Sequence, residues 1–375
     1  MCIRDSYITM KFSISKLELY APLQQVVGVV ERKQTHEVMN NFLFVATADS
    51  LEITGTDNEV ELKTRIPLIV TEPGQSTIPA RKLFDICRSL DDNARLDFEV
   101  DTEKAKVKTG KSRFTLATLP VDEFPLVDEL TDSTVLTLPQ KQLDLAIKRT
   151  AFAMAQQDVR YYLNGLLLQI DASELCCVST DGHRLALHKT AIDIEASDSI
   201  SAIIPRKAIN ELSRLMDDSD TDITLNLTAN HLQVKLGALV MTTKLIDGKF
   251  PDFEKVIPLA SDNIAIVDRD LLKQALSRSA ILANETYKGV RLTLAKDSLG
   301  IQTNNPKHEE AEDELQIDYA GDPMEMGFNV VYLLDVLNAI NSETAELNVS
   351  DNTSSMVIHP SDDKQSTYVV MPMRL

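Results

Sequence analysis

The stretches RKLFDICRSL (residues 81–90), RKAINELSRL (206–215) and VYLLDVLNAI (331–340) share one pattern. Successive copies begin 125 residues apart. In each, apolar residues recur at i, i+3 and i+4, the spacing of a helix that buries one face. A short apolar run and a turn precede each copy. The sequence therefore predicts a strand followed by a helix at three equivalent places in the chain.

A second set of patterns repeats with nearly the same period. Helical patterns and then strand-like alternation open each unit, and a hairpin pattern closes it. The helical patterns cover Ser15–Val26, Gln140–Met154 and Asp268–Ala283. The alternation covers Phe42–Thr54, Leu166–Ser179 and Val290–Gln302. A period this long exceeds the roughly 20–50 residues of solenoid repeats.

We therefore predict an α+β fold of three tandem copies of one domain. Each copy has two helices and about eight short strands in antiparallel sheets. The expected domains cover residues 10–130, 131–258 and 259–375. Residues 1–9 match no element, and we expect them to be a non-native or disordered extension.

Charge is distributed unevenly along the 375 residues. The chain has 38 Lys and Arg against 57 Asp and Glu, a net charge of −19. Yet segments 81–90, 141–151 and 206–215, all predicted helices, each carry a net charge of +2. Basic helices within an acidic protein favour a polyanion facing the helices, through contacts to its backbone rather than to its bases. The alternative is that these cations lie on solvated helix faces as good helix formers.

Motifs for chemistry are weak. Gly110-Lys111-Ser112 is not a phosphate-binding loop, because position 105 is Ala where the motif requires Gly. The four cysteines form no Cys-x-x-Cys pair, which favours a reduced cytoplasmic protein without a zinc site. The run of residues 308–314 with Asp181 and His183 leaves a metal-dependent hydrolase as an unfavoured alternative. We expect no catalytic residue, no metal, no cofactor and no membrane segment.

Five motifs in one order carry a family resemblance. They are DVRYYLNG (158–165), TDGHRL (180–185), IPRK (204–207), FPD (250–252) and VVMPMRL (369–375). Over residues 10–375 the chain resembles bacterial DNA polymerase III β subunits, the sliding clamps. The resemblance implies a DNA replication processivity factor: a head-to-tail homodimer ring of six domains around double-stranded DNA, read without sequence preference. Implied partners are the polymerase III α subunit, an ATP-driven clamp loader and other proteins with clamp-binding motifs. A specialised clamp paralogue is the alternative within the family.

The resemblance also implies three sets of site residues. The partner-peptide pocket would contain Leu163, Thr180, Gly182, His183, Arg184, Leu185, Pro251, Val256, Ser355, Val370, Met371, Pro372 and Met373. Contacts to DNA would come from Lys33, Arg81, Arg88, Gln157, Tyr161, Tyr162, Arg206 and Lys207. The dimer interface would contain Lys108, Lys111, Arg113, Phe114, Leu116, Ile281, Leu282, Glu309 and Glu310.

Two stretches depart from the family pattern. Residues 32–39 lack a proline that the family often has in this loop. Lys255 follows Phe253-Glu254 where Arg is commoner, and Lys lacks the planar guanidinium fork.

Overall fold

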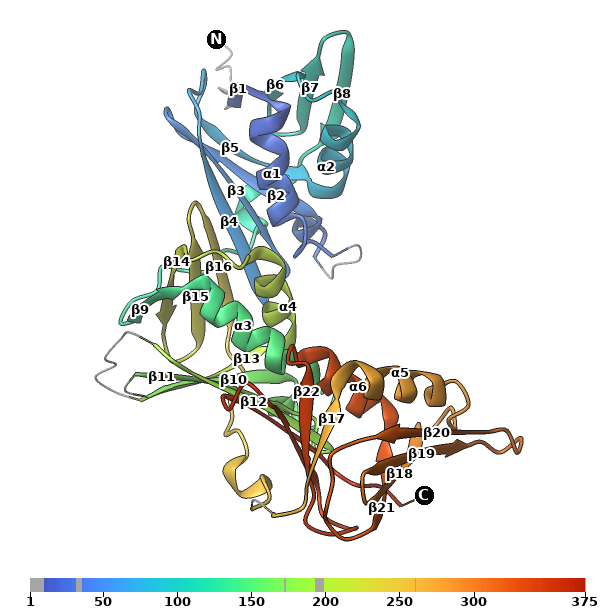
Figure 1. Ribbon diagram of the computed structural model, residues 1–375. Helices are drawn as coiled ribbons and strands as arrows, with labels where there is room; N and C mark the ends of the chain where they lie inside the picture. Colours follow the sequence, from blue (N-terminus) through green and yellow to red (C-terminus); the bar gives the residue numbers. More distant parts are fainter. Residues whose placement is uncertain (1–9, 32–35, 172, 193–198, 260, 375) are drawn as a thin grey trace, which may run out of the picture. The chain divides into compact units, whose positions relative to one another are not determined.

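One order of elements occurs three times along the chain (Figure 1). The structure, a computed structural model, describes residues 10–31, 36–171, 173–192, 199–259 and 261–374. The extension expected at residues 1–9 and the expected DNA contact Lys33 lie outside the described residues. Each repeat runs strand, helix, four strands, helix, three strands. This order confirms the predicted triplication and the α+β class.

The bounds of the elements differ little between repeats. Repeat 1 contains β1 (Met10–Ser15), α1 (Lys16–Val26), β2 (Asn41–Ala46), β3 (Ser50–Thr56), β4 (Val60–Pro67), β5 (Gly74–Pro79), α2 (Ala80–Ser89), β6 (Arg95–Val100), β7 (Lys104–Thr109) and β8 (Ser112–Ala117). Repeat 2 contains β9 (Thr134–Pro139), α3 (Gln140–Thr150), β10 (Gly165–Asp171), β11 (Glu174–Thr180), β12 (Arg184–Ala191), β13 (Ile200–Pro205), α4 (Arg206–Leu215), β14 (Asp222–Leu227), β15 (His231–Leu236) and β16 (Leu239–Lys244). Repeat 3 contains β17 (Ile264–Asp268), α5 (Arg269–Ala280), β18 (Gly289–Ala295), β19 (Ser298–Asn304), β20 (Glu310–Gln316), β21 (Met324–Asn329), α6 (Val330–Ala339), β22 (Thr344–Asn348), β23 (Met356–Pro360) and β24 (Ser366–Val370).

The chain divides into two compact units, each with one four-stranded and one eight-stranded sheet. Unit 1 comprises residues 1–140 and 210–245. Its sheets have the orders β1-β6-β7-β8 and β5-β2-β3-β4-β16-β15-β14-β9. In the larger sheet β4 pairs with β16 antiparallel, from Val60 opposite Thr243 to Thr64 opposite Leu239. This pairing joins strands of repeat 1 to strands of repeat 2 in one continuous sheet.

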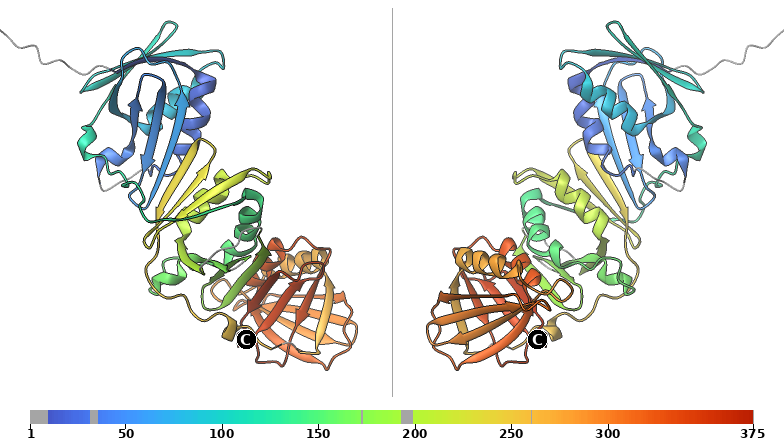
Figure 2. Two further views of the ribbon diagram at one scale, coloured as in Figure 1. Left: turned by 90° about the vertical axis from the view of Figure 1, so that its left-hand side faces the viewer. Right: turned by 90° about the vertical axis from the view of Figure 1, so that its right-hand side faces the viewer.

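Unit 2 comprises residues 141–209 and 246–375. Its sheets have the orders β13-β10-β11-β12-β24-β23-β22-β17 and β20-β19-β18-β21. Here β12 pairs with β24 antiparallel, and Arg184 lies opposite Val370. Repeats 2 and 3 are therefore joined in the same way as repeats 1 and 2. In unit 2, α5 and α6 contact each other and lie against strands of repeat 3 (Figure 2).

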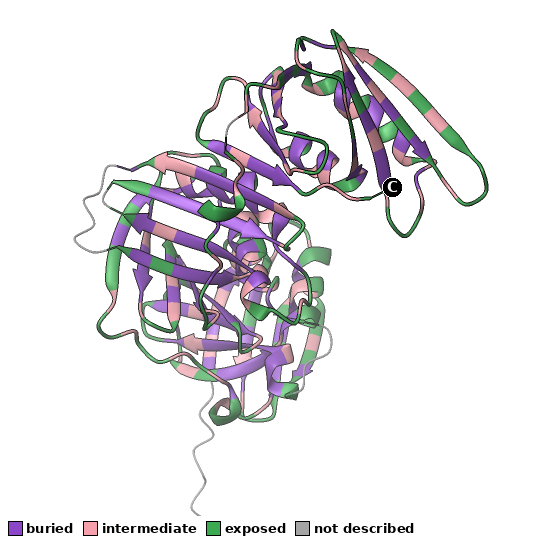
Figure 3. Cartoon of the chain, turned by 90° about the horizontal axis from the view of Figure 1, so that it is seen from below, coloured by how far each residue is buried: buried purple, intermediate pink, exposed green. Residues whose placement is uncertain are grey.

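Local sequence explains where the helices begin. The Ser15 hydroxyl accepts the Glu18 N–H at 3.2 Å, while the Glu18 carboxylate accepts the Ser15 N–H at 3.2 Å. This reciprocal capping box satisfies donors that the first turn of α1 leaves free. Asp268 caps α5 by accepting the Leu271 N–H at 2.8 Å. Strands such as β6, β7 and β17 alternate buried and exposed residues, so they bury one face (Figure 3). Strands β2, β3, β10 and β11 of the eight-stranded sheets are instead buried over most of their length.

The segments that follow the last strand of each repeat dock at one equivalent position. The Leu119 N–H donates to Thr77 Oγ1 at 2.9 Å, next to the middle of β5. The Ile246 N–H donates to the Ile203 carbonyl of β13 at 2.9 Å. Met373 repeats this contact on Gly327 of β21 at 2.8 Å. The three docked residues are 127 positions apart, so the tail after repeat 3 follows the path of the two linkers.

In the described part of the chain, no helix is both long enough and apolar enough to span a membrane.

Candidate functional site

An apolar cavity of about 300 Å³ opens in unit 2 where β11, β12 and β24 end or begin. Eight residues of the predicted peptide pocket line it: Leu163, Thr180, Gly182, Arg184, Leu185, Pro251, Val256 and Met371. Four further lining residues are absent from that prediction: Arg160, Tyr162, Phe253 and Val369. The structure thus brings together segments that lie more than 200 positions apart in the sequence.

The floor of the cavity is a small hydrophobic cluster. Leu185, Phe253 and Val369 are at most 8% exposed and pack in one cluster, against which Tyr162 is packed. Val256, at the mouth, is 46% exposed. Apolar side chains that enter such a site leave water, which stabilises binding by about 1.5–3 kcal/mol for each fully buried Leu or Phe.

The turn between β11 and β12 shapes one wall. Asp181 Oδ1 accepts the N–H groups of His183 at 2.9 Å and Arg184 at 3.0 Å. Thr180 Oγ1 accepts the Gly182 N–H at 3.0 Å. Gly182 has φ +88°, and a Cβ there would lie 2.9 Å from Arg160 Nη2. A Cβ at this position would therefore strain the backbone and displace the Arg160 guanidinium.

Two arginines hold the rim through different contacts. Arg160 makes a two-point ion pair with Asp158, at 3.0 and 2.9 Å, and this hydrogen bonding lowers the pKa of Asp158 to about 2. Arg184 is more enclosed, with its side chain 11% exposed. Its guanidinium donates to Asp181 Oδ2 at 3.0 Å and to the Phe152 carbonyl at 2.9 Å. Planar, charge-assisted contacts of this kind fix a side chain in one orientation.

The structure places the other five predicted pocket residues outside the cavity lining. They are His183, Ser355, Val370, Pro372 and Met373. The His183 ring stacks on Tyr332 with centroids 6.5 Å apart. Val370 is fully buried in the core of repeat 3, because neighbouring residues of a strand face opposite sides. Met373 lines a different cavity, with Asn284 and Tyr287.

The predicted DNA contacts lie on α2 and around the start of α4. Arg81 and Arg88 are exposed on α2, which buries Leu83 and Cys87 on its other face. Arg88 also forms an i, i+3 ion pair with Asp85 at 2.8 Å. The two arginines belong to unit 1, and the remaining described contacts of this set belong to unit 2.

In unit 2, the segment 154–164 lies beside the N-terminus of α4. Arg206 Nη1 donates to the Met154 carbonyl at 2.7 Å, and burial lowers the pKa of Arg206. Tyr161 is 59% exposed and packs edge-on against Tyr162. Gln157 is exposed, with φ +54°, whereas Lys207 is half-buried.

One cation counted in the helix charge is not at the surface. Arg149 of α3 is 8% exposed, and its guanidinium donates to the Ala339 carbonyl at the end of α6. It therefore stabilises the packing of unit 2 instead of contributing to a basic face. Lys148, its neighbour, is more than half exposed and pairs with Asp144 at 2.5 Å. The formal charge of a helix thus overstates the charge it presents.

The predicted interface residues lie on two sheet edges and beside one of them. In the described residues, β8 and β20 each have a paired neighbour on one side only. On the β7–β8 hairpin, Lys108, Lys111 and Arg113 are exposed, Phe114 is half-buried and Leu116 is buried. Glu309 and Glu310 are exposed at the start of β20. Ile281 is 79% exposed just after α5, and Leu282 is half-buried.

The geometry gives the hydrolase alternative no support. The Asp181 carboxylate is occupied by the Arg184 guanidinium and by two backbone N–H groups. Residues 310–316 form β20 instead of a ligand loop. Among the described residues, no group of three or more His, Cys, Asp or Glu side chains is placed to hold a metal ion.

Comparisons with known proteins agree along the whole chain. Three families match in order: the N-terminal domain of the DNA polymerase III beta subunit over residues 10–128, its central domain over 137–252 and its C-terminal domain over 254–374. The chain is 50% identical to the beta sliding clamp of Pseudomonas putida and 43% identical to that of Escherichia coli K12. Each comparison covers 98% of this chain and all of the relative.

Solved structures show the same likeness. The crystal structure of the DNA polymerase III subunit beta from Pseudomonas aeruginosa matches with a TM-score of 0.95 at 48% identity. A sliding clamp from the same species bound to griselimycin matches with a TM-score of 0.94 at 49% identity. Both matches cover 98% of this chain and all of the solved chain. The chain therefore belongs to the DNA polymerase III beta subunit family, the beta sliding clamps.

Proposed function

We propose that this protein is a DNA polymerase processivity clamp. Two copies close head to tail into a ring that encircles duplex DNA, and the ring tethers a polymerase without catalysing a reaction. One observation carries the proposal. The same strand junction occurs twice within the chain, and the two strands that would form a third such junction, β8 and β20, are not paired with each other. The corresponding domains cover residues 10–130, 131–258 and 259–375, and the protein works in the cytoplasm.

The junctions follow the repeats. β4 of repeat 1 pairs with β16 of repeat 2, and β12 of repeat 2 pairs with β24 of repeat 3. By position in the repeat, β20 corresponds to β4 and β12, while β8 corresponds to β16 and β24. Unpaired strand edges readily pair with another chain. If β20 of one copy pairs with β8 of a second, and the reverse, two copies close a ring in which both junction strands of each copy have a partner.

The internal junctions also predict the register of the third. Leu116, Thr243 and Val370 are 127 residues apart and occupy one position in β8, β16 and β24. Thr243 lies opposite Val60, and Val370 lies opposite Arg184. Thr56, Thr180 and Thr303 occupy one position in β3, β11 and β19, and they lie opposite Glu61, Leu185 and Ala311. Val60 and Arg184 directly precede Glu61 and Leu185, so their equivalent in β20 is Glu310, which directly precedes Ala311. Glu310 of one copy would therefore lie opposite Leu116 of the other.

Three positions further along this register, Asp313 lies opposite Arg113. The β7–β8 hairpin carries positive charge at Lys108, Lys111 and Arg113, whereas β20 carries Glu310, Glu312, Asp313 and Glu314. Such complementary charge fixes partner and register more than it adds affinity. We call this junction between two copies the seam. We assign its apolar part to Phe114 and Leu116 of one copy against Ile281 and Leu282 of the other.

A ring explains how an acidic protein can work on DNA. A topological link needs only loose, salt-dependent contacts to phosphates, and these carry no sequence information. We assign those contacts to Lys33, Arg81, Arg88, Gln157, Tyr161, Tyr162, Arg206 and Lys207. The acidic remainder of the chain discourages binding of DNA elsewhere.

The cavity in unit 2 serves as the docking site for partner peptides. It offers an apolar floor of Leu185, Phe253 and Val369 between two fixed arginines. It suits short motifs with Leu and Phe side chains, as expected for the polymerase III α subunit, the clamp loader and other partners. One pocket in each of two copies would let a ring hold two partners at once.

Retention on DNA of two topologies tests the proposal. The protein is loaded on nicked circular plasmid with a clamp loader and ATP, and the plasmid is then cut once. We expect the bound fraction, followed by gel filtration at moderate salt, to stay on circles and to be lost after cutting. Arg113→Glu should abolish retention, whereas Arg95→Glu, an exposed cation of β6 away from the edge, should not. Equal retention on cut and uncut DNA would overturn the ring.

A further inference from the structure

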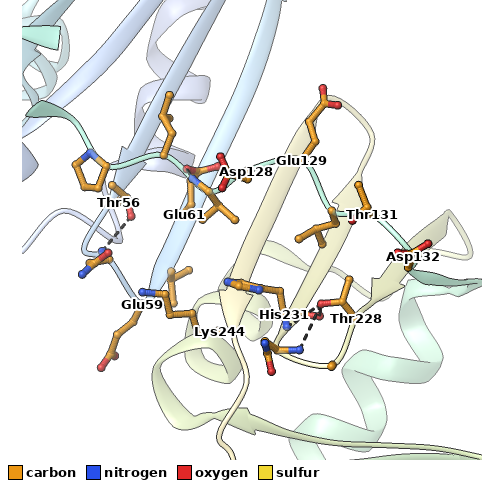
Figure 4. Close-up of a pocket in the computed structure, with 18 residues that line it drawn as sticks. Thr56, Glu59, Glu61, Asp128, Glu129, Thr131, Asp132, Thr228, His231 and Lys244 are labelled. Carbon is orange, nitrogen blue, oxygen red and sulfur yellow. Dashed lines mark hydrogen bonds between the residues drawn. The ribbon is translucent and has the colours of Figure 1, made fainter. Parts of the chain in front are cut away.

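Unit 1 contains a second cavity, of about 510 Å³ (Figure 4). It lies between the end of β3, the start of β4, the linker residues 125–132, the start of β15 and the end of β16. Glu59, Glu61, Asp128, Glu129, His231 and Lys244 are among the residues that line it. The family comparisons and the proposed function assign no role to this cavity.

This cavity is the repeat-equivalent of the apolar pocket. Thr56 and Asn58 occupy the positions of Thr180 and Gly182 in the preceding turn, 124 residues earlier. Pro125 occupies the position of Pro251, 126 residues earlier. In both cavities, a linker crosses the junction where strands of two repeats pair. The fold therefore builds the same kind of recess twice in one chain.

The chemistry of the two recesses differs at matched positions. Glu61 replaces Leu185 on the floor, and Lys244 replaces Met371 at the mouth. Phe253 and Val256 correspond to the smaller Val127 and the less exposed Leu130. Glu61 is thus nearly as buried as Leu185 but carries a carboxylate, and part of the lining around it is still apolar.

The Glu61 carboxylate has one short hydrogen bond and one long ion pair. The side chain is 4% exposed, and its Oε2 accepts the Val127 N–H at 3.0 Å. Lys63 Nζ lies 3.8 Å from Oε1, which is beyond hydrogen-bond distance, and it is shared with Glu52 at 3.9 Å. Burial raises the pKa of Glu61. A cation with a better approach would stabilise this buried charge.

The other residues that line the recess indicate which kind of cationic ligand would fit. Glu59, Asp128, Glu129 and Asp132 outnumber the lining cations, so the recess favours a positive ligand and disfavours phosphate. The described residues offer no cluster arranged for a metal ion. Leu126, 52% exposed, and half-buried Leu130 add apolar contact in the same recess. These features fit a basic side chain on an extended, partly apolar chain.

We propose that this recess is a second docking site, which binds an extended segment of a partner protein through a lysine or arginine placed against Glu61. The apolar pocket takes motifs with Leu and Phe, whereas this site takes basic–apolar motifs. The two sites on one chain can then be occupied by different segments. The proposal does not depend on ring closure.

A fluorescein-labelled hexapeptide of alternating arginine and leucine is the probe, and its binding to the full chain is followed by anisotropy. We expect saturable binding that Glu61→Gln weakens about tenfold, because glutamine keeps the acceptor for the Val127 N–H and removes the charge. Glu103→Gln removes an exposed acid in the β6–β7 turn and should leave affinity unchanged. A peptide with glutamate in place of arginine should not bind.

Two further variants separate this site from the alternatives. Lys244→Met introduces the residue found at the equivalent position of the apolar pocket, Met371, and removes a cation that competes with the probe. It should therefore tighten probe binding several-fold. A misfolded variant would not show such a gain. Gly182→Ala alters the apolar pocket and should leave probe affinity unchanged. Equal affinity for Glu61→Gln and Glu103→Gln would overturn the proposal. So would loss of probe binding in Gly182→Ala, or failure of the probe to saturate.

Discussion

The guanidinium of Arg184 in repeat 2 reaches the Asp335 carboxylate of α6 in repeat 3, with Nη1 2.5 Å from Oδ2. The same group lies over the Tyr332 ring at 4.5 Å and over Phe152 at 5.4 Å. A residue that lines the apolar pocket therefore also joins two repeats within unit 2. The lining of this pocket and the integrity of this junction therefore depend on one side chain.

Arg184→Met should destabilise unit 2 by roughly 2–3 kcal/mol, because it leaves two carboxylates without their cation. The effect stays below that of a fully buried pair, because the Asp335 side chain keeps 33% exposure. Urea unfolding measures the change. Arg160→Met is the matched control: the Arg160 side chain is 47% exposed against 11% for Arg184, so the loss of stability should be clearly smaller. Equal costs would refute the special role of Arg184.

Gly182→Ala should weaken binding of a partner peptide to the apolar pocket. Its φ of +88° disfavours alanine, and the added methyl would collide with the Arg160 guanidinium. Gly237→Ala carries a similar backbone cost at φ +59°, but its Cβ would meet open space. Calorimetric titration with a Leu- and Phe-containing peptide should show a loss for Gly182→Ala only. A comparable loss in both variants would point to general strain.

Arg113 and Asp313 should be energetically coupled across the proposed seam. Alanine at each position, and at both, gives a double-mutant cycle on the dimer dissociation constant measured by sedimentation. Contacting charges typically yield coupling of about 0.5–3 kcal/mol. Arg95→Ala with Asp313→Ala should be additive, since Arg95 lies outside the seam. Additivity of the Arg113 and Asp313 changes would show that the register carried over from the internal junctions is wrong.

Stability of the β12–β24 junction should fall in mild acid because of His188. This side chain is 1% exposed, and burial lowers its pKa below 6.5. His188 Nδ1 lies 2.8 Å from Ser366 Oγ, which donates to Asp363 at 2.8 Å, so Nδ1 carries the proton and buried Nε2 has no partner. Below pH 6.5 the His188 imidazole therefore binds a proton more readily in the unfolded state than in the folded state. The free energy of unfolding is unaffected by this group above pH 6.5 and decreases as the pH falls below it.

Urea midpoints measured from pH 8 to about pH 5 test this contribution. The midpoint of the natural chain should fall more steeply below pH 6.5 than that of His188→Gln. His231→Gln is the control, because His231 is more exposed and lies in unit 1. Parallel curves for the natural chain and His188→Gln would assign the acid sensitivity to carboxylates instead.

The repeat made the fold predictable from sequence. Each copy of a pattern that occurs three times in one chain supports the assignment of the other two. All six predicted helices are present, and their ends lie within a few residues of the predicted ends. Their ends were less predictable. The helix predicted over 140–154 ends at Thr150, whose hydroxyl donates to the Ala146 carbonyl at 2.6 Å, and the chain tightens into a 3₁₀ turn. Such contacts depend on local geometry more than on periodicity.

The pocket was only partly predictable. Val369 lines it and Val370 faces the core, a distinction that strand alternation fixes once the register is known. Phe253 gave a usable signal as an aromatic residue two positions after Pro251. The burial of Arg149 had no local signal, because its acceptor at Ala339 lies 190 residues along the chain.

The shared docking of Leu119, Ile246 and Met373 has a consequence for protein engineering. Because the tail after repeat 3 begins along the path that both linkers take, a copy of residues 120–133 fused after Met373 should lead into a second full chain. The product would be a single-chain dimer with one seam covalently bridged. Such a concatenated clamp would open at one defined gate, so the two seams of a ring could be studied separately.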